Sequence, residues 1–202
     1  MFPTNVMCRS AAILSLVAAA NLCTLELAAQ PAYQGVPSGR VTSKVVLDAV
    51  VPQGTPAAQR PPSHTISVDY GQPHARGRVI AGALIPYGEV WRLGANEATT
   101  LTTSVDLDVG GVNVPKGTYS LHALATATSM QLIVSKKIGA NANVYDAAQD
   151  LARIPMQLQA RTESVESLQI ALAPAGAAAP LGGTLRVKWG TVDAVVPYVA
   201  KP

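Results

Sequence analysis

Apolar and polar residues alternate along most of the chain after residue 64. In residues 65–70 the apolar Ile66, Val68 and Tyr70 are separated by polar neighbours. Because successive side chains of a β-strand point to opposite faces of the sheet, a period of two predicts strands with one buried and one solvated face. The same period recurs in residues 99–109, 118–124, 130–135, 154–160, 168–172, 185–189 and 192–199, and residues 41–47 and 89–93 are short β-prone segments.

Turn signals separate these predicted strands. Gly110-Gly111 is typical of a hairpin, and Pro115-Lys116-Gly117 of a turn with proline early and glycine late. The only helix-like stretch, residues 143–151, is short. About nine or ten strands joined by frequent turns predict an all-β fold, an antiparallel β-sandwich with Greek-key or jelly-roll connections. Pro197 interrupts the last strand, which we therefore expect at a sheet edge.

The first 29 residues have the composition of an export signal. Arg9 is the one charge among residues 1–10, an apolar run follows at residues 11–20, and the segment ends on small residues. This pattern predicts a signal peptide over residues 1–29, and therefore a periplasmic or secreted bacterial protein. A buried N-terminal helix is the alternative interpretation. The apolar run is shorter than the about 20 residues that span a bilayer, and no later segment reaches that length, so we expect no transmembrane span after signal removal.

Residues 30–63 form a leader between the signal and the β domain. Residues 30–40 lack periodicity and predict a flexible arm, and residues 41–47 are a candidate first strand. Residues 52–63 hold four prolines. Because proline cannot donate a hydrogen bond to a β-ladder, this Pro-rich insertion predicts a long loop or a disordered segment. The β-sandwich is expected over residues 64–202 as a single domain.

Composition narrows the chemistry further. Both cysteines, Cys8 and Cys23, lie in the predicted signal peptide. The mature chain would therefore have no disulfide, no thiolate catalysis and no cysteine metal site. Lipid anchoring at Cys23 is not expected, because Leu22 rather than a small residue precedes it. A net charge of +3, with basic and acidic residues interleaved, does not indicate nucleic-acid binding.

Two strings of the sequence are unusually distinctive. They are VDYGQPHARGRVIAGALIPYGEVWRLGANEATTLTT from residue 68 and VDLDVGGVNVPKGTYSLHAL from residue 105. They resemble the bacterial family known as domain of unknown function 2911 (DUF2911), specifically over roughly residues 64–137 and more loosely to residue 200. The resemblance implies an exported or periplasmic β-rich protein and no established activity. The chain departs from the family pattern in its long Pro-rich insertion at residues 48–63.

The residues of the first string suggest a ligand site. Arginine forks suit carboxylate or phosphate groups, and aromatic rings can stack on sugars. The sequence therefore predicts a non-catalytic binding or envelope-associated module for an anionic or carbohydrate small ligand, or for an envelope protein partner. In the alternative interpretation the same residues are structural: a core tryptophan, an Arg92–Glu97 ion pair and an asparagine that satisfies turn backbone. The candidate ligand-binding residues are Arg76, Arg78, Tyr87, Trp91, Arg92, Asn96 and Glu97.

A metal-assisted hydrolase is the alternative function. One imidazole and several carboxylates in this region, with a second histidine further on, could bind a divalent metal. The spacing signal is weak, because the chain has no His-x-His or His-x-x-x-His motif, and no cofactor is otherwise predicted. Ser120 beside His122 does not form a nucleophilic relay by itself, and a Gly-x-Ser-x-Gly motif is absent. The candidate metal ligands are His74, Glu89, Glu97 and His122.

Overall fold

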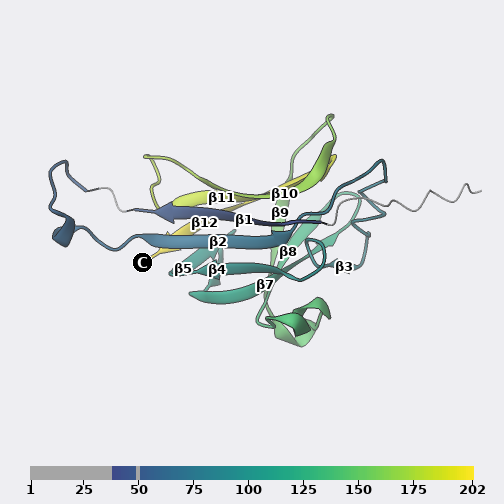
Figure 1. Ribbon diagram of the computed structural model, residues 1–202, viewed down its shortest axis with the longest axis horizontal. Helices are drawn as coiled ribbons and strands as arrows, with labels where there is room; N and C mark the ends of the chain where they lie inside the picture. Colours follow the sequence, from purple (N-terminus) through teal and green to yellow (C-terminus); the bar gives the residue numbers. More distant parts are fainter. Residues whose placement is uncertain (1–37, 49–50) are drawn as a thin grey trace, which may run out of the picture. The chain divides into compact units, whose positions relative to one another are not determined.

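The computed structural model describes residues 38–48 and 51–202 (Figure 1). The predicted signal peptide of residues 1–29, with Cys23, lies outside the described residues, as does the predicted flexible arm up to residue 37. Within the described residues, no helix has the length and hydropathy that crossing a membrane requires.

The described part of the chain is built from twelve strands, with three short 3-10 turns and no α-helix. The 3-10 turns are η1 (Ala57–Gln59), η2 (Ala140–Asn143) and η3 (Ala147–Gln149), so the predicted helix-like stretch at residues 143–151 is not a helix. The strands are β1 (Arg40–Leu47), β2 (His64–Gly71), β3 (Val90–Trp91), β4 (Thr99–Thr103), β5 (Asp106–Val109), β6 (Val112–Val114), β7 (Gly117–Ala125), β8 (Met130–Ser135), β9 (Asp150–Leu158), β10 (Val165–Pro174), β11 (Gly182–Gly190) and β12 (Val192–Lys201).

Nine of these strands form one continuous antiparallel path, in the order β1-β2-β4-β7-β8-β9-β12-β11-β10. Strand β9 joins the two halves, because its first part pairs with β8 and its last two residues pair with β12. The path nearly closes on itself, since Leu172 of β10 donates its backbone N–H to Oγ of Ser43 on β1 at 2.9 Å. The fold is a near-barrel, and the prediction of an all-β antiparallel fold is confirmed (Figure 1).

The core explains why the predicted alternation holds. The inward positions of β2 (Ile66, Val68 and Tyr70) are buried, and so are Leu121 and Leu132 on β7 and β8. Strand β1 pairs with β2 residue for residue, so the candidate first strand of the leader is part of the same sheet. The apolar inward face fixes which residues point outward, because a slip of one residue would reverse both faces.

The stretch at residues 99–109 was predicted as one strand but forms two. Its inward residues stay buried throughout, yet the strand changes partners at Ser104 and Val105, with β4 pairing to β2 and β7, and β5 to β12 and β6. Oγ of Thr103 donates to the carbonyl of Val105 at 2.6 Å, which stabilises the corner. The hydrophobic alternation continues through the corner, so the sequence pattern could not reveal it.

The prediction that Pro197 marks a sheet edge is wrong. Strand β12 pairs with β11 on one side and with β9 and then β5 on the other. The N–H of Gly110, directly after β5, donates to the carbonyl of Pro197 at 2.9 Å. The backbone polar groups of Pro197 therefore face the edge of β12 that pairs with β9 and β5, not the edge that pairs with β11. Pro197 falls between the residues paired to those two strands, so its missing N–H leaves no ladder bond unmade.

A close backbone crossing positions the loop that follows β3. Ala95 donates its N–H to the carbonyl of Gly71, at the end of β2, at 3.0 Å. A Cβ atom on Gly71 would overlap the carbonyl oxygen of Ala95. The loop containing Asn96 and Glu97 can therefore approach β2 only because residue 71 has no side chain.

We expect Gly71→Ala to destabilise the protein, because the two backbones must separate. The free energy of unfolding should fall by about 1–3 kcal/mol, the usual cost of overpacking. Thermal unfolding followed by circular dichroism measures the change. Gly39→Ala is the matched control, since a Cβ there would meet no atom within 4 Å. Equal melting temperatures for the two variants would contradict this account of the crossing.

Candidate functional site

A row of polar side chains crosses the outward face of the sheet. Each member lies directly opposite the next on the neighbouring strand, from β1 through β2, β4, β7 and β8 to β9. Directly paired residues of an antiparallel sheet point to the same face, so their side chains are neighbours. The row consists of Thr42, Asp69, Thr100, Ser120, Ser135 and Asp150.

Part of this outward face is buried. Ser120 is 1% exposed and His122, two residues further along β7 on the same face, is 2% exposed. The connection between β8 and β9, residues 136–149, covers them: its Ala142 and Tyr145 both contact His122. We call residues 136–149 the cover segment. It carries the turns η2 and η3 and is the green excursion beside β7 in Figure 1.

His122 is held neutral by its surroundings. Its Nε2 lies 3.3 Å from the carbonyl oxygen of Ala142, and its ring lies 5.3 Å from the ring of Tyr145. Burial lowers the pKa of His122, and this effect outweighs the Ala142 carbonyl and the Asp150 carboxylate, which both favour the charged form. Since a carbonyl can only accept, Nε2 carries the hydrogen and Nδ1 is a lone-pair acceptor.

Polar atoms without partners are concentrated under the cover segment. Within the described residues, four buried side-chain atoms have no hydrogen-bond partner: Oγ of Ser120, Nδ1 of His122, Oδ1 of Asp150 and the hydroxyl of Tyr198. Three of these four lie in the row or beside it. The other oxygen of Asp150 accepts from Tyr145 at 2.6 Å and from Arg153 at 2.9 Å. Because buried polar atoms are normally paired, this grouping is the strongest sign of a site.

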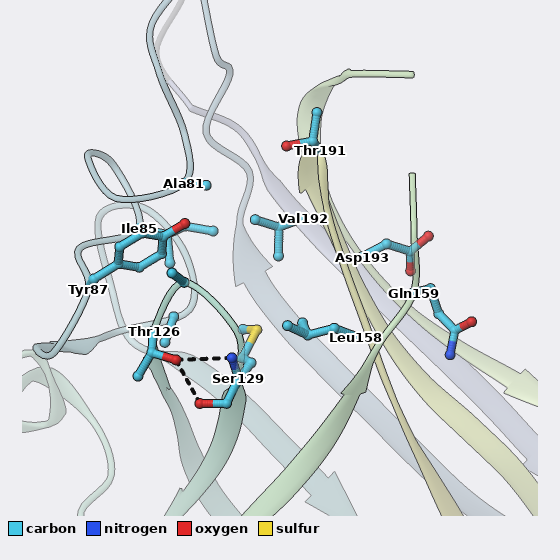
Figure 2. Close-up of a pocket in the computed structure, with 13 residues that line it drawn as sticks. Ala81, Ile85, Tyr87, Thr126, Ser129, Leu158, Gln159, Thr191, Val192 and Asp193 are labelled. Atoms are coloured by element: carbon cyan, nitrogen blue, oxygen red, sulfur yellow. Dashed lines mark hydrogen bonds between the residues drawn. The ribbon is translucent and has the colours of Figure 1, made fainter. Parts of the chain in front are cut away.

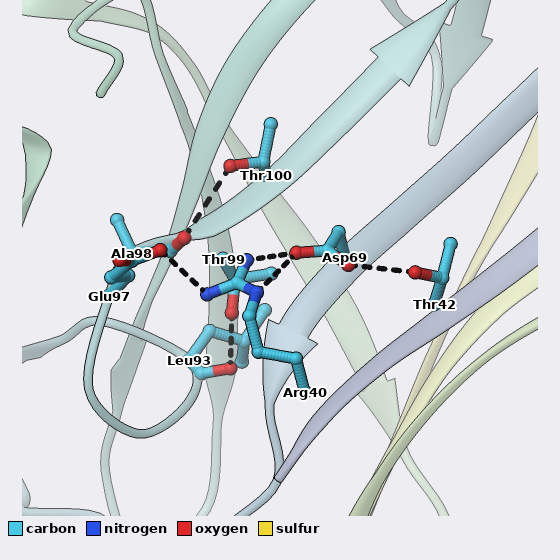
Figure 3. A network of polar contacts seen from close by, with 8 residues as sticks. All are labelled: Arg40, Thr42, Asp69, Leu93, Glu97, Ala98, Thr99 and Thr100. Carbon is cyan, nitrogen blue, oxygen red and sulfur yellow. Dashed lines mark hydrogen bonds and ion pairs between the residues drawn. The ribbon is translucent and has the colours of Figure 1, made fainter. Parts of the chain in front are cut away.

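A hollow of about 270 Å³ opens beside the covered residues. Arg40 bridges two acids there, of which only Glu97 lines the hollow: it bonds to the carboxylate of Asp69 and lies 3.1 Å from that of Glu97 (Figure 3). We call this cavity the Arg40 hollow. It is lined by Arg40, Glu97, Ala98, Thr100, Gly139 and Asn143, so one member of the row and two residues of the cover segment contribute to its walls.

The Arg40 hollow is electrostatically organised. Partial burial would raise the pKa of Asp69, but hydrogen bonds from Thr42 and Arg40 outweigh it and hold the pKa below its ordinary value. Glu97 comes from the loop after β3, where Asn96 adopts a left-handed conformation (φ 62°) and donates from Nδ2 to the Ser38 carbonyl at 3.2 Å. The predicted Arg92–Glu97 ion pair is wrong, because Glu97 pairs with Arg40.

The other predicted arginines lie elsewhere. Arg78 donates to the carbonyls of Ala75 and His74, while the backbone N–H of Arg76 donates to Glu166 at 2.7 Å. These contacts tie the turn at residues 72–78 to the start of β10. Arg92 is exposed, and in the described part of the chain its side chain makes no hydrogen bond or ion pair. Trp91 stacks on Trp189 with ring centroids 5.8 Å apart, as the structural interpretation expects of a core anchor.

Tyr87 lines a separate, smaller pocket of about 160 Å³ (Figure 2). Its walls include Ile85, Leu158 and Val192, and Thr126 and Ser129 are hydrogen-bonded to each other at its rim. Asp193 also lines it, but two bonds of 2.7 Å from Arg186 engage both carboxylate oxygens and lower its pKa despite burial. We call this cavity the Tyr87 pocket. Three of its polar side chains, Thr126, Ser129 and Asp193, already have partners.

The candidate metal ligands do not converge. Nδ1 of His74 is hydrogen-bonded to Ser167 at 2.7 Å, Glu97 is at the Arg40 hollow, and His122 is under the cover segment. Glu89 is exposed at the start of β3. Across residues 38–48 and 51–202, no three His, Cys, Asp or Glu side chains are placed to hold a metal ion. The arrangement therefore gives the metal hypothesis no geometric support.

Sequence reasoning singled out Asn96, Glu97 and His122 but missed their partners. Arg40 lies in the segment predicted to be a leader, and Asp150 in one predicted to be helix-like. Comparing the outward residues of neighbouring strands would have identified the polar row. That comparison requires the order of the strands in the sheet, which the sequence pattern does not give. The burial of Ser120 depends on the cover segment, which has no periodic pattern.

The architecture defines the class, an antiparallel β near-barrel with a partly covered polar face. A family model described as "Protein of unknown function (DUF2911)" matches residues 52–198, and the chain belongs to this family. The resemblance seen in the two sequence strings is thereby confirmed. No curated protein and no solved structure matches the chain.

His122 predicts a pH dependence of stability. Because its folded-state pKa is lowered, the unfolded chain takes up a proton below its ordinary value of about 6.5 while the folded chain does not. The free energy of unfolding should therefore fall as the pH drops below about 6.5, until the lowered pKa is reached, and His122→Gln should remove this contribution. Melting temperatures measured between neutral and mildly acidic pH test it. His64→Gln is the control and should keep the native slope, so a native slope in His122→Gln would contradict the prediction.

Proposed function

We propose that the protein is an exported, non-catalytic binding module that holds a small, neutral, polyhydroxylated ligand, such as a single sugar, in the Arg40 hollow. The observation that supports this most is the hollow itself, a polar cavity of about 270 Å³. One of its lining residues, Thr100, pairs across the sheet with Ser120, whose buried hydroxyl has no partner. The predicted signal peptide supports a periplasmic or secreted location.

The charge balance favours a neutral ligand over an anion. Arg40 brings one positive charge, and Asp69 and Glu97 bring two negative charges close to it. A carboxylate or phosphate ligand would compete with two acids already bonded to the same guanidinium. A sugar hydroxyl can accept from a guanidinium N–H and donate to Glu97 or Thr100 without adding charge.

Size and lining also favour the Arg40 hollow over the Tyr87 pocket as the ligand site. Ligand sites are typically about 300–1,000 Å³, so the Arg40 hollow, at about 270 Å³, suits one sugar ring rather than an oligosaccharide. The Tyr87 pocket is smaller, at about 160 Å³, and its Thr126, Ser129 and Asp193 side chains already have partners. Its exposed tyrosine ring could stack on a ligand, but its one charged side chain, Asp193, is bonded to Arg186 and buried, whereas Arg40 and the exposed Glu97 line the hollow.

Binding of neutral monosaccharides tests the proposal. D-Glucose, D-galactose, D-mannose and the anionic D-glucuronate are titrated at millimolar concentrations and followed by isothermal calorimetry or protein chemical shifts. At least one neutral sugar should bind, and more tightly than glucuronate. Glu97→Gln should weaken the binding of that sugar about tenfold, the effect of losing a hydrogen bond to a charged group.

Glu89→Gln is the matched control, since Glu89 is an exposed acid outside the hollow. It should bind like the native protein. Both glutamates are exposed, so neither substitution should disturb folding. The proposal fails if no neutral sugar binds, if only glucuronate binds, or if Glu97→Gln and Glu89→Gln behave alike.

A further inference from the structure

Two residues that line the Arg40 hollow are neighbours of the Ser120–His122 pair. Thr100, which lines the hollow, lies directly opposite Ser120, so their Cβ atoms are about 5 Å apart. Asn143, on the other wall, follows Ala142, whose carbonyl faces His122. Ser120 and His122 share one face of β7 and are buried next to this lining, of which they are not themselves part.

The two atoms have complementary hydrogen-bonding roles. Nδ1 of His122 can only accept, because the hydrogen is on Nε2. Oγ of Ser120 can donate or accept. The Cα atoms of residues two apart on a strand are about 6.6–6.8 Å apart, and two hydrogen bonds of about 2.8 Å through one oxygen span up to about 5.6 Å. One oxygen therefore reaches both side chains when these lean toward each other by about 1 Å along β7. A group that donates once and accepts once would satisfy both atoms.

An alcohol hydroxyl has this property. An ionised carboxylate cannot donate to Nδ1, and an ammonium cannot accept from Oγ. Asp150 is two strands away in the row from Ser120, about 10 Å in Cα spacing, and its other oxygen already has two donors. The Ser120–His122 pair is thus a separate, neutral recognition point.

We propose that Ser120 and His122 form an inner subsite of the Arg40 hollow, in which one hydroxyl group of the ligand donates to Nδ1 of His122 and accepts from Oγ of Ser120. This inference rests on the proposed binding of a polyhydroxylated ligand. It adds that recognition depends on one particular hydroxyl of the sugar, because a ligand lacking that hydroxyl would leave the buried atoms unpaired.

Deoxy sugars test the subsite. The monodeoxy analogues of whichever sugar of the panel binds most tightly (D-glucose, D-galactose or D-mannose) are titrated against the native protein and against Ser120→Ala. One analogue should bind the native protein about tenfold more weakly than its parent sugar. For Ser120→Ala this penalty should shrink to about twofold or less, because half of the recognition of that hydroxyl has been removed.

Thr118→Ala is the matched control. It removes a hydroxyl from the same face of β7, at an exposed position whose Oγ1 lies 3.4 Å from that of Thr102. It should keep the native discrimination. Ser120→Ala removes a buried atom that has no partner, so it should fold normally, and its melting temperature verifies this. His122→Gln is the second variant and should lose the same discrimination.

The outcomes separate the two proposals. If no neutral sugar binds the native protein, the proposed function fails. If a sugar binds and Glu97→Gln weakens it, but Ser120→Ala discriminates among the analogues as the native protein does, the hollow is a binding site and the inner subsite is wrong. That result would assign the buried atoms to a structural water instead.

Discussion

The register of five antiparallel pairings is the constraint on which the rest of the structure depends. From β1 to β9 the strands align so that one row of hydroxyl and carboxyl groups crosses the outward face. The inward apolar residues maintain this register, because a slip of one position would bury the polar row and expose the core. The position of the candidate site is therefore a consequence of core packing, and the outward residues need not attract one another to be aligned.

The cover segment buries part of that polar row. An antiparallel sheet with a polar outward face in water is ordinary. Here residues 136–149 fold back over β7 and β8, and Ile133 and Ala142 become fully buried outside the main core. The cover segment removes water from Ser120 and His122 and supplies the Ala142 carbonyl to Nε2 of His122, but it leaves Nδ1 of His122 and Oγ of Ser120 without partners. The same segment forms one wall of the Arg40 hollow, so the covered residues and the open cavity are parts of one arrangement.

Local sequence patterns predicted most of the strands well. They failed to predict strand pairing and side-chain contacts, because these depend on residues distant in the sequence. Alternation of two is a property of one strand, so it identified β2, β7 and β8. It could not show that the chain changes strand partners at Ser104, or that Pro197 faces the gap between two neighbouring strands. For the site, Glu97 was recognised by its residue type, but its partner Arg40 comes from a segment read as a leader. A contact 57 residues away leaves no local signal.

Two independent features favour the same class of ligand. Around Arg40 the charge is already balanced by two acids, which disfavours an anion. On β7, where Ser120 pairs with the lining residue Thr100, a neutral histidine acceptor and a serine hydroxyl match a group that both donates and accepts. A purely structural face could have alanine at position 120 and an aromatic residue at position 122, which would leave no buried polar atom unpaired. Each unpaired polar atom lowers the stability of the empty protein by about 1–3 kcal/mol. The polar pair is costly in the empty protein, and a bound hydroxyl group removes that cost, so ligand binding and folding would be stabilised by the same two hydrogen bonds.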